Sequence, residues 1–458
     1  MRKIAVLALA FPSLAVASGY SLPNTSPRDL GVSASALAAQ YDSGAAFTLP
    51  AGLARLDGPS ATVAGGAVTL SVKWKDPTGA ASDTSIDRKF TPIGNLSVAY
   101  GGKIAALGDR GWGVGFGVEP FGGSVVSWPS DWAGRYRIVK VDRQVFSGVL
   151  TAGVEVVNRV RLGGGLLYYY TKEELSQHAF MAPFAGTSPA DIGNPATWNP
   201  TLPDAVGTID ANGGALSYDV SAEVQPLPDL PLTFAVDYKH KASQTLKGDA
   251  KWSNLTPLAS ATGALGATPF ANMDAQQELT IPNRLEIGAA YRALKPLLFT
   301  AAYTFDRWVV YDKDVLEGAN GYKISIPRNY SNGWTIRGGA EYDFTDMVAG
   351  RIGLQYDHSG LDPKYYSPTL PDATSVGVTL GARVKVAQGV AVEAAAFYAK
   401  MHEVTSQDPN PATPGTGLEP TYSPPSTFIP ATEGTFRGTY DTSAFIFTVG
   451  LGWTPGAK

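Results

Sequence analysis

A two-residue alternation of apolar and polar side chains runs through most of this chain and constrains its fold more than any other feature. It recurs from about Ser60 to Trp453. In residues 232–239, for example, Leu, Phe, Val and Tyr alternate with Thr, Ala, Asp and Lys. Strict alternation is typical of β-strands whose two faces meet different surroundings. The chain is therefore predicted to be all-β.

The connections between the alternating segments follow a second rhythm. Short turns, such as 107–110 and 344–346, alternate with long, polar, Pro-rich loops, such as 173–212, 313–327 and 405–436. Six short and seven long connections join fourteen segments. This rhythm is typical of bacterial outer-membrane barrels. We predict a 14-stranded antiparallel transmembrane β-barrel over residues 60–453. The alternative, a soluble multi-sheet protein, explains the alternation but not the rhythm.

The composition narrows the possible chemistry. The 458 residues include no Cys and four His, and 17% of them are charged, compared with about 25% in soluble domains. The absence of Cys excludes thiol catalysis, disulfides and Cys-ligated zinc. The net charge of −4 gives no reason to expect a nucleic-acid partner. We expect no enzyme activity, no cofactor and no metal site.

The N-terminus has the pattern of a secretory signal peptide. Arg2 and Lys3 precede an apolar run, Ile4–Leu14, and Ala15–Ala17 supplies the small residues of a cleavage site. The apolar run is shorter than the roughly 20 residues that a membrane-spanning helix needs, which disfavours an N-terminal anchor. We predict a signal peptide at residues 1–17.

Residues 18–59 do not alternate, and they precede the first predicted strand. A 14-stranded barrel has a lumen too wide for the side chains of its wall to fill. The segment is expected either to plug that lumen as a hatch or to hang free on the periplasmic side. At the other end, Trp453 closes the last predicted strand, and residues 454–458 form a short C-terminal tail.

Five short stretches carry a family resemblance through their order and spacing. They are Ser18–Leu22 with Leu30 and Gly31, Leu49–Leu53, Pro120–Gly122, Ser130–Tyr136 and Ser367–Asp372. Across essentially the whole mature chain, the sequence resembles the FadL family of outer-membrane transporters. The resemblance implies a 14-stranded barrel whose lumen is closed by an N-terminal hatch. It also implies that outer loops capture a fatty acid, alkane or aromatic hydrocarbon, which enters an apolar pocket and leaves sideways through a gap in the wall.

One proline interrupts the third predicted strand. Residues 111–126 have strand character, yet they contain Pro120 followed by Phe121 and Gly122. Proline cannot donate a ladder hydrogen bond and is confined to edges and bulges, whereas a closed barrel has no edge. Either the wall is interrupted here, so that an apolar ligand leaves laterally, or the strand ends at Glu119 and the motif starts the outer loop. The resemblance favours the lateral opening.

The resemblance also implies ligand-binding residues. It aligns one basic position of the family with Lys172, which follows Tyr168 and Tyr170, whereas the second basic position falls on Ser331. Arg337, further along the same strand, is a distant substitute. Because a buried carboxylate needs a cationic partner, the incomplete pair favours neutral hydrocarbons over fatty acids. Alternatively, Lys172 snorkels at the membrane rim.

Three further groups complete the expected site. Near the mature N-terminus, Tyr20 and Leu22 are expected either to contact the ligand or to pack the hatch. In the hatch, the family's Asn-Pro-Ala motif reads Leu49, Pro50 and Ala51, and the proline fixes a bend. Apolar side chains on the long outer loops are expected to cover one another or to capture ligand. These loop residues are Phe180, Phe184, Trp198, Trp252 and Phe270.

The expected function is uptake of hydrophobic compounds, either long-chain fatty acids or hydrocarbons, across the bacterial outer membrane by facilitated diffusion, with lateral exit near Pro120–Gly122. The protein would act as a monomer in contact with membrane lipid and lipopolysaccharide. The alternative is an uptake channel for aromatic hydrocarbons or other neutral xenobiotics. A general porin and an outer-membrane hydrolase fit less well. A hatch would obstruct the first, and the second needs a Ser/His pair that the scattered histidines do not suggest.

Overall fold

The structure is a computed structural model of the whole chain. It describes residues 19, 21–76, 79, 81–87, 90–192, 194–264, 270–406, 418–420, 428–430 and 437–455. The predicted signal peptide, residues 1–17, lies outside the described residues, and so does Tyr20.

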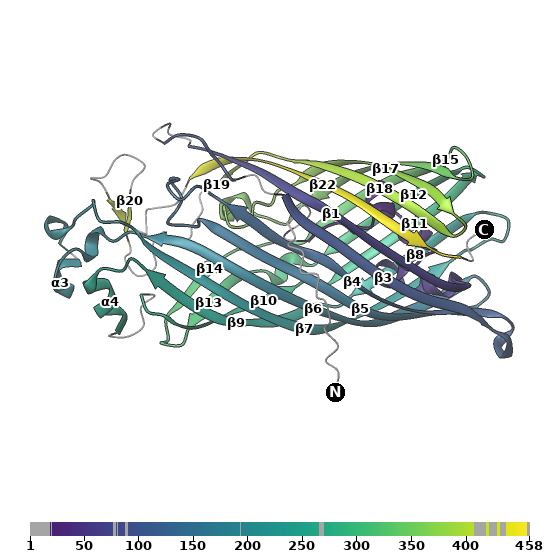
Figure 1. Cartoon of the computed structure of the whole chain (residues 1–458), viewed down its shortest axis with the longest axis horizontal. Helices are drawn as coiled ribbons and strands as arrows, with labels where there is room; N and C mark the ends of the chain where they lie inside the picture. Colours follow the sequence, from purple (N-terminus) through teal and green to yellow (C-terminus); the bar gives the residue numbers. More distant parts are fainter. Residues whose placement is uncertain are drawn as a thin grey trace.

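The wall is a closed barrel of fourteen antiparallel strands, as predicted. Each strand pairs with the next along the chain, and β22 pairs with β1 from Ala61–Trp453 to Lys75–Thr439, which closes the ring (Figure 1). Five of the fourteen strands are interrupted and carry two labels each. In chain order they are β1 (Gly58–Lys75), β3 (Phe90–Ile104), β4 (Arg110–Ser127), β5 (Lys140–Val157), β6 (Val160–Ala179), β7 (Ala205–Val224), β8 and β9 (Leu232–Lys239, Ala242–Ser253), β10 and β11 (Met273–Ile281, Arg284–Leu294), β12 and β13 (Leu297–Asp306, Lys313–Gly318), β14 and β15 (Lys323–Pro327, Gly333–Asp343), β16 (Val348–His358), β17 (Ser375–Ala387), β18 and β19 (Val390–Met401, Val404–Ser406) and β22 (Gly438–Trp453).

Short elements fill the connections and the segment before β1. Among the described residues, no helix is long and apolar enough to cross a membrane. The long loops, with α3 and α4, gather at one end of the barrel, which we call the outer end, and the C-terminus lies at the other (Figure 1). The short elements are α1 (Pro27–Gly31), η1 (Leu37–Ala39), α2 (Ala45–Thr48), η2 (Pro50–Arg55), β2 (Thr84–Ser85), η3 (Ala105–Leu107), η4 (Ala182–Phe184), α3 (Pro189–Ile192), η5 (Pro195–Thr197), α4 (Pro257–Ala264), η6 (Trp308–Val310), η7 (Pro363–Tyr365), β20 (Leu418–Pro420) and β21 (Phe428–Pro430).

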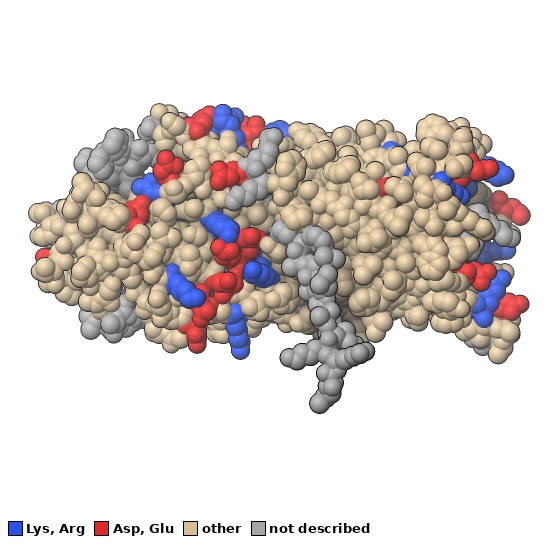
Figure 2. Space-filling view, viewed as in Figure 1, with Lys and Arg blue, Asp and Glu red and all other residues tan. Residues whose placement is uncertain are grey.

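The two faces of the wall are those of a membrane barrel. In β8, Phe234 and Val236 are exposed on the outside, whereas Ala235 and Asp237 are buried inside. The same division recurs around the ring, and Figure 2 shows a broad band nearly free of charged side chains between the two ends. Apolar side chains therefore face the membrane and polar side chains face the lumen, which is the pattern expected of strands that meet lipid on one side only.

Several strands extend beyond the positions that the sequence suggested. The predicted loop 313–327 contains the hairpin of β13 and β14, and the predicted loop 173–212 is shortened at both ends by β6 and β7. The outer parts of these strands carry polar residues on the outward face because they have left the membrane for water. Backbone pairing continues there without apolar alternation, so the sequence pattern of a membrane strand fades before the strand ends.

Residues 21–57, which we call the hatch segment, lie against the inner face of the wall. Their helical turns contact β4, β5, β6, β8, β11, β17 and β18, which lie on different sides of the ring. Glycines in the wall permit this close approach: a Cβ on Gly153 would overlap the Pro50 carbonyl oxygen, and one on Gly163 would overlap the backbone of Ala51. The hatch segment therefore occupies much of the lumen at this level.

Candidate functional site

One seam of the wall is incomplete. β3 and β4 pair from Ile104–Arg110 to Leu96–Val118, and no further β3–β4 pair is formed in the described part of the chain. Beyond that point β4 continues to Ser127, paired with β5 alone, while residues 90–95 of β3 pair with β1 alone. The wall therefore has a gap in its hydrogen bonding between the outer halves of β3 and β4.

A bulge at Pro120 bends β4 at this gap. The register against β5 shifts between Pro120 and Gly122, so Phe121 is the extra residue of the bulge. Gly123 follows with a φ of 150°. Because proline offers no N–H to a neighbouring strand and a bulge bends its strand, β4 leaves the line of β3 here. The strand does not end at Glu119, so the alternative that the motif starts an outer loop is wrong.

A second proline, which sequence reasoning missed, lies on the other side of the gap. Pro92 belongs to the stretch of β3 that has no β4 partner. Continuing the register from Leu96–Val118 would place Pro92 opposite Gly122. The signal was present in the sequence, because a proline inside an alternating segment marks an unpaired strand edge.

The hatch segment occupies the gap on its inner side. Ser21 forms an isolated antiparallel bridge with Gly122, and the Leu22 amide donates to the Phe121 carbonyl at 2.8 Å. The Asn24 Nδ2 donates to Glu119 Oε2 at 3.2 Å. Leu22 is 4% exposed. The start of the hatch segment thus supplies part of the backbone pairing that β3 does not give to β4.

An inner chamber of about 70 Å³ lies beside this bridge, between the hatch segment and the bent part of β4. Its lining is rich in charge. Arg284 forms a bidentate pair with Asp306 at 2.8 and 3.1 Å. Lys239 contacts both Asp237 and Asp219. These two cations are therefore already neutralised by carboxylates of the wall.

Arg337 is the exception among the cations of the inner chamber. Its side chain is 5% exposed and lines the chamber, as the expected ligand contact would. Nη1 donates to the Thr304 hydroxyl, but Nε has no hydrogen-bond partner, and no carboxylate of the described residues lies within 4.0 Å. A buried guanidinium with unused donors is suited to a polar group of a ligand.

A second cavity of about 140 Å³, the outer pocket, lies nearer the loops. Its walls are mostly apolar, and its floor is a network of paired charges. Arg143 binds Glu173 at 2.6 and 3.0 Å, and Arg328 binds Asp314 at 2.7 Å. Paired charges hold the floor while leaving apolar surface for a ligand. The apolar lining comes from Ile138, Val141, Leu175, Ile209, Leu316, Ile324, Ile326 and Leu370.

A buried apolar cluster joins the two cavities. Phe121 and Tyr169, whose ring centroids are 5.2 Å apart, line the inner chamber, and Leu370 lines the outer pocket. Trp308 and Tyr330 belong to the same cluster. These side chains fill the space between the cavities, so a ligand that passes from one to the other has to displace them.

The expected ligand residues of β6 face the membrane instead of the lumen. Tyr168 and Tyr170 are 49% and 39% exposed, and Lys172 continues the same outward face. Inside, the neighbouring Thr171 and Glu173 are buried. This placement corrects the expectation that Lys172 lines the interior: in a strand, side chains two residues apart share a face, and this face is the outer one.

The expected capture residues of the loops mainly pack on one another. Phe270 lies 5.1 Å from Phe184 and 5.2 Å from Trp252, measured between ring centroids, and Phe180 packs against Tyr136 at 5.9 Å. Trp198 lies beside the Phe180 cluster. Of the five expected residues, Trp252 alone reaches the outer pocket.

A polar cluster fixes the loop after β4 over the outer end. Arg135 Nε binds Asp204 Oδ2 at 2.8 Å, and the Tyr136 hydroxyl donates to Asp204 Oδ1 at 3.0 Å. Burial opposes ionisation of Asp204, but His178 and Arg135 outweigh it and lower the pKa of this carboxyl. The stretch Ser130–Tyr136 is thereby tied to the start of β7.

The expected hatch motif lies against the wall. Leu49 and Ala51 are fully buried, and Pro50 begins η2. The Ala51 amide donates to Ser221 Oγ at 2.9 Å. Arg55 binds Glu223 at 2.8 Å at the end of the same turn.

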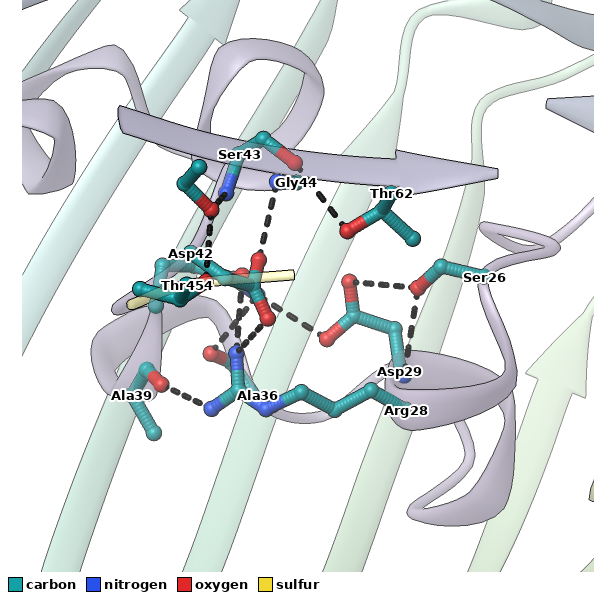
Figure 3. A network of polar contacts seen from close by, with 12 residues as sticks. Ser26, Arg28, Asp29, Ala36, Ala39, Asp42, Ser43, Gly44, Thr62 and Thr454 are labelled. Atoms are coloured by element: carbon teal, nitrogen blue, oxygen red, sulfur yellow. Dashed lines mark hydrogen bonds and ion pairs between the residues drawn. The ribbon is translucent and has the colours of Figure 1, made fainter. Parts of the chain in front are cut away.

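A polar network holds the hatch segment near the C-terminal end of β22, at the end of the barrel opposite the long loops (Figure 3). Arg28 binds Asp42 at 3.4 Å and also donates to the Ala39 carbonyl. The Ser43 amide donates to Ser60 Oγ at 2.9 Å, and Ser60 Oγ hydrogen-bonds Thr454 Oγ1 at 2.8 Å. The first residue after the last strand therefore takes part in holding the hatch segment.

Comparison with known proteins gives a consistent result. A family described as outer membrane protein transport protein (OMPP1/FadL/TodX) matches residues 8–454. An outer membrane protein of Neisseria meningitidis serogroup B is 25% identical over 429 residues, which cover 88% of this chain and 90% of the relative.

Solved structures share the fold at low sequence identity. A Pseudomonas aeruginosa FadL homologue superposes with a TM-score of 0.78 at 19% identity, over 96% of this chain and 100% of its own. The P. putida toluene transporter TodX gives a TM-score of 0.64 at 14% identity, over 90% and 94%.

Proposed function

The chain belongs to the family of outer membrane transport proteins described as OMPP1/FadL/TodX, and on that premise we propose that it passes apolar small molecules sideways into the membrane through the gap between β3 and β4. The family transports hydrophobic compounds across the bacterial outer membrane. The route that we propose runs from the outer pocket, through the apolar cluster, to the inner chamber and the gap.

The observation that carries this proposal is the incomplete seam. A barrel wall is normally closed by backbone hydrogen bonds, yet here two strands part over several residues and a separate segment bridges with one of them. A bridge of this kind is released by moving Ser21 and Leu22, without unfolding the wall. Transfer of a ligand from cavity to lipid needs no energy source, because apolar area stays out of water at roughly 25 cal/mol per Å².

For the ligand, we propose neutral or weakly polar hydrocarbons. Two of the three cations in the inner chamber already hold carboxylates, and Glu119 lies at the gap itself. In the inner chamber an ionised fatty acid would therefore find a single cation without a carboxylate partner, Arg337, and would pass a carboxylate on its way out. The structural relative TodX is named a toluene transporter, which is in keeping with a neutral ligand. A polar head group, where a ligand has one, would contact Arg337.

A disulfide across the bridge tests the lateral route. The chain has no Cys, so the pair Ser21→Cys and Gly122→Cys introduces a single possible bond between residues that face each other. We expect uptake of labelled toluene or alkane into vesicles that carry the oxidised variant to stop, and to return on reduction. The matched control is Val63→Cys with Leu451→Cys. These residues are partners in the fully paired seam between β1 and β22, so oxidation should change nothing.

The same vesicles separate this function from its rivals. Heat-resistant migration on gels verifies that both variants are folded barrels. Uptake that continues while the introduced disulfide between positions 21 and 122 is intact would exclude the lateral route. Large ion conductance in a planar bilayer would identify a porin instead. An interior filled by the hatch segment favours low conductance.

A further inference from the structure

Five acidic side chains lie in one row across the outside of the barrel. Successive strands pair Asp142 with Glu174, Glu174 with Asp210, Asp210 with Asp249 and Asp249 with Asp274. The row therefore crosses β5, β6, β7, β9 and β10 without a break. All five belong to the outward face of their strands, because their sequence neighbours on either side belong to the other face.

Lysines flank this acidic row on both sides. Two residues toward the membrane, Lys172 and Lys247 both pair with Asn212 of β7. Lys140 and Lys251 lie two residues from the acidic row on the side of the loops. Lys140 is the first residue of β5, and Lys251 lies near the end of β9. Figure 2 shows a line of acidic side chains with basic ones on each side, crossing the outer part of the face that β6, β7 and β9 form. We call these nine residues the charged belt.

Ion pairs within the protein neutralise only part of the belt. Like charges directly opposite one another on neighbouring strands repel. Lys140 binds Glu174 at 2.8 Å and Lys251 lies 3.8 Å from Asp249. In the described part of the chain, Asp210 and Asp274 have no cation within 4.0 Å, and Lys172 and Lys247 have no carboxylate within that distance.

The opposite side of the barrel shows what a self-sufficient arrangement looks like. There, near the outer ends of β1, β18 and β22, each lysine has its own carboxylate: Lys73 binds Asp83 at 2.8 Å, Lys75 binds Glu403 at 2.8 Å, and Lys400 binds Asp441. All three of these lysines are thus paired within the chain, whereas part of the belt is left unpaired. The unpaired charges of the belt are available to outside partners.

The position of the belt identifies the surroundings of those partners. Toward the outer end of the barrel, the outward face of β6 carries Leu166, Tyr168, Tyr170 and then Lys172. On β7, Leu216 lies on the membrane side of Asn212. Apolar residues give way to tyrosines and then to charges. Tyrosines collect at the boundary between hydrocarbon and head groups, so the belt lies at the level of the outer-leaflet head groups.

We propose that the charged belt binds the phosphate groups of an anionic glycolipid of the outer leaflet. Lys172 and Lys247, next to the tyrosines, contact the phosphates directly. The carboxylate row reaches further phosphates through divalent cations, because Mg²⁺ is bound by one or two carboxylates together with phosphate oxygens. This arrangement gives Lys172 and Lys247 the anionic partners that the described chain does not supply.

Binding of rough lipopolysaccharide to the purified, folded protein tests the proposal. Fluorescently labelled lipid is titrated in detergent with Mg²⁺ and again with EDTA. We expect Lys172→Gln with Lys247→Gln to weaken binding by about ten-fold under both conditions, since each basic residue near an anionic lipid surface contributes a factor of several. Asp210→Asn with Asp274→Asn should remove the difference between Mg²⁺ and EDTA.

Two controls make the result decisive. Lys73→Gln with Lys75→Gln, on the self-paired side, removes the same charge and should leave binding unchanged. Lipid treated with phosphatase should bind the wild-type protein as weakly as the lysine variant binds intact lipid. Equal binding by all variants, or equal binding of dephosphorylated lipid, would overturn the proposal. Tighter binding by the Asp210/Asp274 variant in Mg²⁺ would overturn the cation bridge. All substitutions point away from the core, and heat-resistant migration on gels verifies folding.

Discussion

The paired strands β1 and β3 each border a seam of the wall, β1 with β22 and β3 with β4. These two seams are closed in opposite ways. β1 and β22 are paired along almost their whole length, so the first and last strands close the ring with their own backbone hydrogen bonds. β3 and β4 are paired only up to Leu96–Val118, and a segment from the start of the chain bridges to β4 beyond that point. The seam between β1 and β22, the closed seam, is continuous backbone pairing. The seam between β3 and β4, the open seam, is completed by a separate segment.

The difference teaches where a barrel can be opened at low cost. Unzipping β1 from β22 would break many hydrogen bonds in lipid, where no water replaces them. Moving Ser21 and Leu22 away from Phe121 and Gly122 breaks few, and the wall strands keep their other partners. Prolines on both sides of the gap keep it from closing by itself.

The largest effect is expected from damage to the closed seam. A Cβ on Gly66 would overlap the Phe447 carbonyl of β22, whereas one on the adjacent Gly65 would meet nothing closer than 3.9 Å. We expect Gly66→Ala to cost about 1–3 kcal/mol and to reduce the yield of folded barrel sharply. Gly65→Ala, the matched control, should fold like the wild type. Equal yields, measured by the fraction of heat-resistant protein in membranes, would show that the seam tolerates crowding.

An intermediate effect is expected from extending the open seam. Pro92→Thr with Pro120→Ala restores a backbone donor on each strand, so pairing can continue beyond Leu96–Val118. Each hydrogen bond regained should add about 1 kcal/mol to the free energy of unfolding, while uptake of labelled hydrocarbon falls. Pro59→Ala, near the first residue of β1, serves as a control that should alter neither. Unchanged uptake together with increased stability would separate the gap from transport.

The smallest effect concerns pH at the open seam. In the loop between β16 and β17, Asp372 accepts hydrogen bonds from the Gly19 amide at 2.9 Å and from Ser359 Oγ at 2.6 Å. Burial raises the pKa of Asp372 from 3.8 to about 7. Because the folded state holds this proton more tightly than the unfolded state, its contribution to stability is complete below about pH 4 and is lost as the pH rises through about 7.

We therefore expect the attachment of Gly19 to loosen between pH 5 and pH 8, which limited proteolysis of the N-terminal segment should detect. Asp372→Asn mimics the protonated carboxyl and should make cleavage independent of pH. The closed seam is held by the backbone pairing of β1 with β22 and should show no such dependence. A pH effect that persists in Asp372→Asn would assign the titration to another group.

The sequence was informative about the wall because alternation in a membrane barrel is imposed by lipid. Together with the turn signals, it predicted fourteen strands in antiparallel order, although the predicted long loop 313–327 is a hairpin. Pro120 was identifiable because a strand proline has few allowed places. The strand ends in water, such as β13 and β14, carried no apolar alternation and were assigned to loops.

The ligand residues of β6 were misplaced for a related reason. Leu166, Tyr168 and Tyr170 point outward, but the intervening Leu167 and Tyr169 are apolar too and lie buried in the lumen cluster. With both faces apolar, the pattern could not tell inside from outside, and a shift of one residue exchanges the faces. Arg337 was placed correctly in the interior because its strand alternates clearly.

The tight fit between the hatch segment and the glycines of the wall also constrains how this molecule is made. η2 packs so closely on Gly153 and Gly163 that a Cβ on either glycine would overlap it, and η2 precedes every wall strand in the chain. The ring closes where the first strand meets the last. The hatch segment is therefore most readily enclosed while that joint is still open, so that biogenesis wraps the barrel around its own N-terminus instead of inserting a plug into a finished tube.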